Sequence, residues 1–169
     1  MPVRKSLRIN AFDYSSPGAY FITFCTCNKR HTLSRIVGAI HESPFPQLTS
    51  YGQIADAVIR NIPAQLSVAI DRYVIMPNHI HLIAIISEED ALREIRESPQ
   101  ASRSIISKLV GYIKMNASKA IHLHYGDISV WQRGYYDHVI RNQEDYNMIA
   151  EYIDTNPIRW TLDKLYTEE

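Results

Sequence analysis

Two histidines, His79 and His81, stand out because a single apolar residue, Ile80, separates them at the start of an otherwise apolar run. Side chains alternate across a strand, so both imidazoles should point to one face, about 6–7 Å apart. Two neutral imidazoles at that separation can chelate one metal ion. Buried polar groups are costly unless something satisfies them, which favours a metal site here over two ordinary half-buried histidines.

The residues around the pair predict two strands joined by a tight connection. Residues 68–75 and 79–86 are rich in β-branched side chains, and a Met-Pro-Asn break separates the two segments. Such a break between apolar runs is typical of a hairpin. The histidines should therefore lie at the beginning of the second strand.

The remaining elements follow from periodicity and capping signals. Residues 31–50 are expected to be irregular, with a small hairpin through 37–40, and residues 87–102 to be a mobile acidic loop. The predicted regular elements are a strand at 19–27, a helix at 51–66 with Ser50 as N-cap and an end near Pro63, a helix at 102–124, a strand at 129–140, and a helix from an N-cap at Asn142 to about Thr155.

This order predicts an α+β protein with a ferredoxin-like β-α-β-β-α-β core, an antiparallel sheet with two helices on one face. In that arrangement the strand with the two histidines is central. The additional C-terminal helix is free to cover the other face. Tyr152 and Asn156 are four residues apart on that helix, so they should lie together over the paired histidines. We expect one domain over residues 1–169, with a core from about 19 to 163.

Composition is that of an ordinary globular chain, with 46% hydrophobic and 21% charged residues. Neither a membrane-length apolar run nor a signal peptide is evident, so we expect a cytoplasmic protein without a membrane partner.

The formal net charge of zero argues against a uniformly basic surface that would bind nucleic acid without selectivity. However, residues 1–35 and 101–141 carry net charges of +5 and +4, against −4 and −5 for residues 36–100 and 142–169. Two basic segments could form one electropositive face.

The basic segment 101–141 supplies candidate contacts to backbone phosphates, since Lys and Arg provide most of the affinity for nucleic acid. The candidates are Lys108, Lys114, Arg133 and Arg141. A solvated helix face is the alternative interpretation for the lysines.

The two cysteines, Cys25 and Cys27, lie two apart in a predicted strand, where a disulfide is geometrically poor. We interpret them as small core thiols. A zinc site with His31 is a weaker alternative, because a second ligand pair at a recognised spacing is missing.

Residues 76–81, Met-Pro-Asn-His-Ile-His, resemble the histidine–hydrophobic–histidine motif of single-tyrosine transposases, small enzymes that move insertion sequences as single-stranded DNA. Lys114, the block VWQRGYYDHVIR at 130–141, and YIDTNP at 152–157 followed by Trp160 resemble the REP-associated branch of that family. The resemblance covers residues 19 to about 163. It implies a ferredoxin-like fold and cleavage of single-stranded DNA, often beside a hairpin, through a covalent 5′-phosphotyrosine.

Carried over to this chain, the resemblance implies that His79 and His81 are metal ligands, that Asn156 supplies the third, and that Tyr152 is the nucleophile. Imidazole nitrogens with an amide oxygen leave positions for phosphate and water, which suits Mg²⁺ or Mn²⁺. The implied partner is single-stranded DNA with hairpin or palindromic repeats, bound by a monomer or homodimer. The chain departs from many relatives in its neutrality, which bears on the strength of DNA binding.

Two functions from different classes remain open. The favoured one is a metal-dependent nicking and strand-transferring enzyme. The alternative is a non-catalytic, domesticated module that binds nucleic-acid hairpins on the same sheet, which stacking aromatics on an exposed sheet face would support. A replication-initiator or relaxase nickase is a lesser alternative. Among eleven tyrosines, Tyr135, Tyr136 and Tyr146 rival Tyr152 as nucleophile.

Overall fold

The computed structural model describes residues 15–38, 43–63, 66–97 and 103–168. Two short 3-10 turns, η1 (Cys27–Lys29) and η3 (Trp160–Leu162), accompany the main elements. The strands and helices are β1 (Gly18–Cys25), β2 (Ser34–Val37), β3 (Phe45–Leu48), α1 (Ser50–Arg60), β4 (Ala69–Ile75), β5 (His79–Ile86), α2 (Glu88–Glu97), α3 (Ile105–Tyr125), β6 (Tyr136–Ile140) and α4 (Gln143–Thr155).

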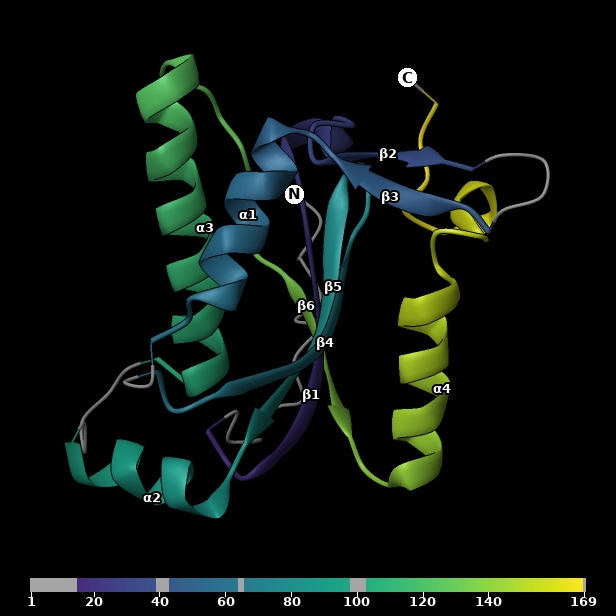
Figure 1. The fold of residues 1–169 in the computed structure, drawn as a ribbon. Helices are drawn as coiled ribbons and strands as arrows, with labels where there is room; N and C mark the ends of the chain where they lie inside the picture. Colours follow the sequence, from purple (N-terminus) through teal and green to yellow (C-terminus); the bar gives the residue numbers. More distant parts are fainter. Residues whose placement is uncertain (1–14, 39–42, 64–65, 98–102, 169) are drawn as a thin grey trace, which may run out of the picture.

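Four strands form one antiparallel sheet in the order β4-β5-β1-β6. Helices α1 and α3 cover one face, and α4 lies against the opposite face (Figure 1). The predicted ferredoxin-like arrangement is therefore confirmed, with β1 and β5 at the centre and an additional C-terminal helix. Among the described residues, no helix combines the length and apolarity that a membrane span requires.

The strand β5 alternates between two cores, as a central strand covered on both faces should. Ile80, Leu82, Ala84 and Ile86 pack into the core under α1 and α3, whereas Ile83 packs into a smaller core under α4. The smaller core also contains Val74, Met76, Ala150, Ile153 and Trp160. His79 and His81 share the face of Ile83, so they point toward α4 and away from the larger core.

The segment between β1 and α1 is more regular than we expected. A small hairpin through 37–40 is wrong: Ser34–Val37 pairs with Phe45–Leu48 in a separate two-stranded sheet, and residues 39–42 lie outside the described residues. Pro46 is tolerated because a two-stranded sheet leaves it at an edge. The helix cap is Thr49, not Ser50, since the Thr49 hydroxyl accepts from the Gly52 amide at 3.2 Å.

Two helix boundaries also differ from prediction. Helix α1 ends at Arg60, so the predicted extension to residue 66 is wrong; the residue before Pro63 is disfavoured in helical conformation. Residues 88–97 form helix α2 in place of a mobile loop. Its first turn carries Glu88, Glu89 and Asp90, whose negative charges interact favourably with the positive end of the helix dipole. The Ser87 hydroxyl caps the helix by accepting a hydrogen bond from the Asp90 amide.

The predicted strand at 129–140 is confirmed only from Tyr136 onward. The carbonyls of Gln132 and Gly134 accept hydrogen bonds from the Lys114 ammonium, which holds this irregular segment against α3. Gly134 also adopts a φ of 81°, which does not belong to a strand. Trp131, within this irregular segment, forms an isolated antiparallel β-bridge with Thr26.

Candidate functional site

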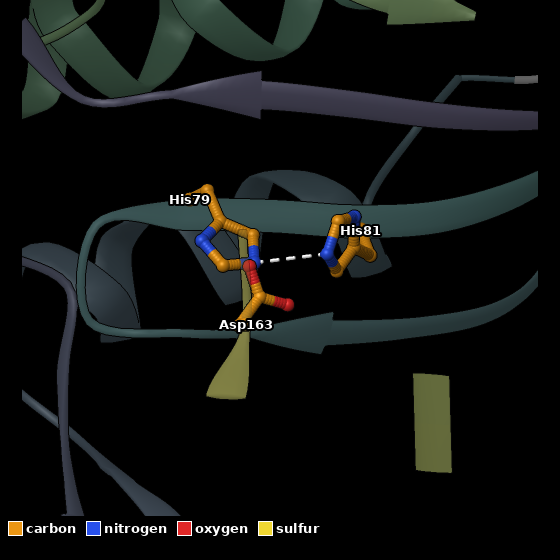
Figure 2. Close-up of side chains that lie close together, drawn as sticks. All are labelled: His79, His81 and Asp163. Carbon is orange, nitrogen blue, oxygen red and sulfur yellow. Dashed lines mark hydrogen bonds between the residues drawn. The ribbon is translucent and has the colours of Figure 1, made fainter. Parts of the chain in front are cut away.

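The two histidines are almost fully buried, with 0% and 2% of their surfaces exposed. Both rings project from the same face of β5, and the His79 Nε2 and His81 Nε2 atoms lie 2.9 Å apart (Figure 2). This is closer than the strand rise alone would give, because the rings turn toward each other. The predicted shared face is confirmed by this geometry.

The other ring nitrogens are held by neighbouring side chains. His79 Nδ1 lies 2.8 Å from the Asn78 Oδ1 atom, and His81 Nδ1 lies 2.7 Å from the Thr23 Oγ1 atom. Thr23 comes from β1, directly opposite His81 in the antiparallel register. Both Nε2 atoms are therefore left facing the space under α4.

Burial keeps both imidazoles uncharged near neutral pH. Desolvation lowers the pKa of His79 to about 4, with the nearby Asp163 carboxylate acting in the opposite direction. Desolvation, and then the charge that His79 would carry, hold the pKa of His81 well below its ordinary value. Neutral imidazoles are the form that binds metal ions.

Helix α4 carries Tyr152 and Asn156 to the histidines. Its N-cap is Asn142, as predicted, whose side chain accepts from the Asp145 amide at 2.8 Å. Ala150 and Ile153 pack the helix against the sheet, and an exposed ion pair joins Asp154 of the helix to Arg72 of β4. The Tyr152 hydroxyl lies 3.3 Å from His81 Nε2, although 39% of the residue is exposed.

The rival tyrosines lie elsewhere. The Tyr146 hydroxyl donates to Asp71 at 2.7 Å, and the Tyr135 hydroxyl bonds with Ser107 at 2.9 Å. Tyr136 lies on the edge strand β6 with 42% of its surface exposed. Of the four candidate nucleophiles, Tyr152 is the one in hydrogen-bonding contact with the histidine pair.

Asp163 completes the cluster, and the sequence reasoning missed it. Its Oδ2 atom accepts hydrogen bonds of 2.6 Å from both the Tyr152 hydroxyl and the Asn156 amide nitrogen. It lies after the end of α4, immediately following the 3-10 turn η3, and its carboxylate lies beside the two imidazoles (Figure 2). Buried Trp160, whose ring centroid is 5.9 Å from that of His79, anchors this turn. Its position in the sequence relative to Tyr152 does not predict that Asp163 joins the site, because a turn and not a regular helix places it there.

Burial and hydrogen bonding together shift the pKa values of Tyr152 and Asp163. Burial, and then the hydrogen bond to Asp163, raise the pKa of Tyr152 well above its ordinary value. Burial acts to raise the pKa of Asp163, but hydrogen bonds from Tyr152, the Leu165 amide and Asn156 lower it. The pair is therefore a phenol donating to a carboxylate.

The donor set fits a metal ion. Ligand atoms of His79, His81 and Asp163 lie within 4.8 Å of one another. Two adjacent ligands at about 2.1 Å from an ion are about 3 Å apart, which the separation of the two Nε2 atoms matches. Because Asn156 turns its nitrogen toward Asp163, its Oδ1 atom is buried without a hydrogen-bond partner. Imidazole nitrogens, a carboxylate and an amide oxygen are donors that Mn²⁺ or Mg²⁺ accepts, and the Asn156 amide that carries this oxygen is hydrogen-bonded to Asp163.

Two of the four candidate phosphate contacts, Lys114 and Arg133, lie in one region, because the Lys114 ammonium bonds the carbonyls on either side of Arg133. Lys108 forms an ion pair with Glu94 of α2, and Lys114 donates to the carbonyls of the 132–134 segment at 2.8 and 2.5 Å. Burial lowers the pKa of Lys114 to about 8. Arg133 and Arg141 are exposed. Their contact with DNA stays a prediction.

Cys25 and Cys27 are free thiols of intermediate exposure, so they are less buried than the core thiols we predicted. Cys25 ends β1 opposite His79, and η1 begins at Cys27. Among the described residues, the group of three potential metal ligands is His79, His81 and Asp163, and it does not include these thiols. The weaker zinc alternative with His31 gains no support.

The fold is shared with a REP-associated tyrosine transposase solved bound to a REP hairpin. The two structures align with a TM-score of 0.62 and 22% sequence identity over 93% of this chain and 74% of the other. In sequence, a Haemophilus influenzae protein named "Putative REP-associated tyrosine transposase" is 31% identical over 88 residues, which span 50% of this chain and 47% of that protein. The resemblance to REP-associated tyrosine transposases is thus confirmed in fold and, over half the chain, in sequence.

A second Haemophilus influenzae protein, which is uncharacterized, is 34% identical over 174 residues covering 98% of this chain and 94% of its own length. This chain belongs to the same family as that protein. A scan against protein-family models finds no match.

Proposed function

We propose that this protein nicks single-stranded DNA beside a hairpin and transfers the cut strand, with Tyr152 as nucleophile. The observation that carries the proposal is the contact of the Tyr152 hydroxyl with both His81 and Asp163 in a buried cluster of potential metal ligands. Similarity to transposases, one of them solved with a REP hairpin, supports hairpin DNA as the substrate.

In this proposal His79, His81 and Asn156 hold a divalent ion, Mg²⁺ or Mn²⁺, and Asp163 is a further ligand candidate. When bound, the ion would neutralise charge on the non-bridging oxygens of the scissile phosphate. The Asn156 amide is suited to this role because its nitrogen is occupied by Asp163, leaving the oxygen for the ion.

The Tyr152 oxygen attacks the phosphorus, a 5′-phosphotyrosine bond forms, and the bond to the 3′-oxygen of the preceding nucleotide breaks. The phenol proton has an acceptor in place, since the hydroxyl already donates to the Asp163 carboxylate at 2.6 Å. The released 3′-oxygen takes a proton from solvent. Attack by another 3′-hydroxyl on the phosphotyrosine reverses these bond changes, so the strand is joined without an external energy source.

Within a single chain, the Tyr152 hydroxyl already lies against His81 and Asp163. Helix α4 packs on its own sheet through Ala150 and Ile153, and the Arg72–Asp154 ion pair ties it to β4. Action of Tyr152 in cis therefore needs no rearrangement of α4, whether the protein is a monomer or a homodimer.

The alternative, a hairpin-binding module without catalysis, has weaker support. It calls for aromatic side chains on an open sheet face. Phe21 lies on the relevant face of β1, but its ring centroid is 5.1 Å from that of His81 and 6.1 Å from that of Tyr152, so helix α4 covers it. A binder also has no need of a tyrosine held against paired histidines.

The test incubates the protein with Mn²⁺ and labelled single-stranded DNA that carries a hairpin and an unpaired flank. We expect a denaturation-resistant protein–DNA adduct that a chelator abolishes and that Tyr152→Phe lacks. Tyr146→Phe is the matched control, because it makes the same change on the same helix at a phenol bound to Asp71. Tight hairpin binding without any adduct would instead favour the non-catalytic module.

A further inference from the structure

The hydrogen bonds around the two histidines have assignable directions, and Asn78 fixes them. The Asn78 side-chain nitrogen faces the Leu165 carbonyl oxygen at 2.9 Å, and a carbonyl oxygen can only accept. The Oδ1 end of the amide therefore faces His79 Nδ1, which must carry a proton in order to donate to it. His79 then presents an unprotonated Nε2 atom to its neighbour.

The direction of the remaining bonds follows from this one. Because His79 Nε2 is an acceptor, the 2.9 Å contact between the two rings requires a proton on His81 Nε2. The Tyr152 oxygen, whose own proton goes to Asp163, can accept from the same N–H group at 3.3 Å. His81 Nδ1 then has a free lone pair, and the Thr23 hydroxyl donates to it at 2.7 Å.

A shared metal ion needs a different state of His81. Both Nε2 atoms must then offer lone pairs, so the His81 proton has to reside on Nδ1. The partner of that nitrogen must donate in the first state and accept in the second. A hydroxyl is able to do both by rotation, whereas an amide end, a carbonyl or a carboxylate holds one role.

We propose that Thr23 is a positioning residue that lets His81 exchange tautomers, so that the histidine pair passes from its mutual hydrogen bond to joint ligation of one ion. Asn78 holds His79 in the single tautomer that both states use. The exchange removes one proton from Nε2 and adds one to Nδ1, so the pair stays neutral. This inference rests on the metal site of the proposed function and assigns a role to two residues outside that ligand set.

The burial of Thr23 supports this role. Only 7% of the residue is exposed, and β1 holds it opposite His81 on a central strand, so water is poorly placed to replace its hydroxyl. Partners of metal-bound histidines typically contribute 10- to 100-fold to metal affinity.

Three variants separate positioning from packing. Thr23→Val keeps the shape and removes the hydroxyl, and Thr23→Ser keeps the hydroxyl. Thr26→Val makes the same change at a buried threonine whose hydroxyl bonds the carbonyls of Arg30 and Asn78 and no histidine. Thermal unfolding of each metal-free variant reports the purely structural cost.

Two measurements are made on the full chain. Calorimetric titration with Mn²⁺ should show affinity falling about 10- to 100-fold in Thr23→Val, with Thr23→Ser and Thr26→Val within about threefold of wild type. Nitrogen-15 spectra of the imidazoles in metal-free wild-type protein should place the proton on Nδ1 of His79 and on Nε2 of His81. Equal Mn²⁺ affinity of Thr23→Val and wild type, or a metal-free His81 protonated on Nδ1, would overturn the inference.

The tautomer role of Thr23 and the metal site are tested separately. A wild-type protein that binds Mn²⁺ and forms the DNA adduct, with a Thr23→Val variant that does both equally well, overturns the tautomer role alone. A wild-type protein that takes up no Mn²⁺ overturns the metal site of the proposed function and this inference with it.

Discussion

Acidification should destabilise the metal-free protein through His79 in a predictable amount. The unfolded chain binds a proton on this residue below its ordinary pKa of 6.5, whereas burial holds the folded value at about 4. Stability is therefore fully present above pH 6.5 and is lost as the pH falls toward 4, because the unfolded state binds more protons. Each pH unit in that window costs about 1.4 kcal/mol, so His79 alone accounts for about 2 kcal/mol by pH 5 and about 3 kcal/mol by pH 4.

Urea unfolding in a chelating buffer at pH 7.5, 6 and 5 measures this loss. A change of about 2 kcal/mol shifts the midpoint by about 1 M in urea. Carboxylates add their own pH dependence; Asp163, whose pKa is lowered by its hydrogen bonds in the folded protein, loses its stabilising contribution at lower pH than His79 does. The informative quantity is therefore the difference between wild type and His79→Gln. Between pH 7.5 and pH 5 the variant should lose about 2 kcal/mol less stability than wild type. Parallel pH dependence in the two proteins would refute the reasoning, because the depressed pKa of His79 would then contribute nothing.

Two further expectations concern the metal and the DNA. Mn²⁺ titration should show one site that weakens markedly in His81→Ala, and undiminished binding by that variant would contradict a shared ion. Arg133→Ala should weaken hairpin binding and flatten the log–log salt dependence by about one unit or somewhat less. Lys114→Met should also lower the melting temperature, because its ammonium bonds two backbone carbonyls. An unchanged salt slope in Arg133→Ala would assign Arg133 to a solvated surface. An unchanged slope in Lys114→Met would leave Lys114 with the structural role of holding the 132–134 segment.

The sequence predicted those parts of the fold that follow from local patterns. Alternation along β5 sends Ile80 and Leu82 into one core and the two histidines to the other face. The cap at Asn142 marks the start of α4, and Pro157 follows its end. These features depend on neighbours in sequence.

The features that the sequence did not reveal depend on contacts between distant segments. Thr23 and His81 are 58 residues apart, and strand register brings them together. Asp163 reaches the site because η3 and buried Trp160 turn the chain back, which no spacing rule encodes. The irregular segment before Tyr136 is likewise held by a residue distant in sequence, because the Lys114 ammonium bonds the carbonyls of Gln132 and Gly134.

Locating the covalent bond to DNA tests most directly whether Tyr152 is the nucleophile. After reaction with hairpin DNA and Mn²⁺, nuclease and trypsin digestion should leave a nucleotide on the peptide of residues 142–159, which contains both Tyr146 and Tyr152. Fragmentation should place the added mass on Tyr152. A nucleotide on Tyr146, or on the 134–141 peptide that holds Tyr135 and Tyr136, would contradict the account.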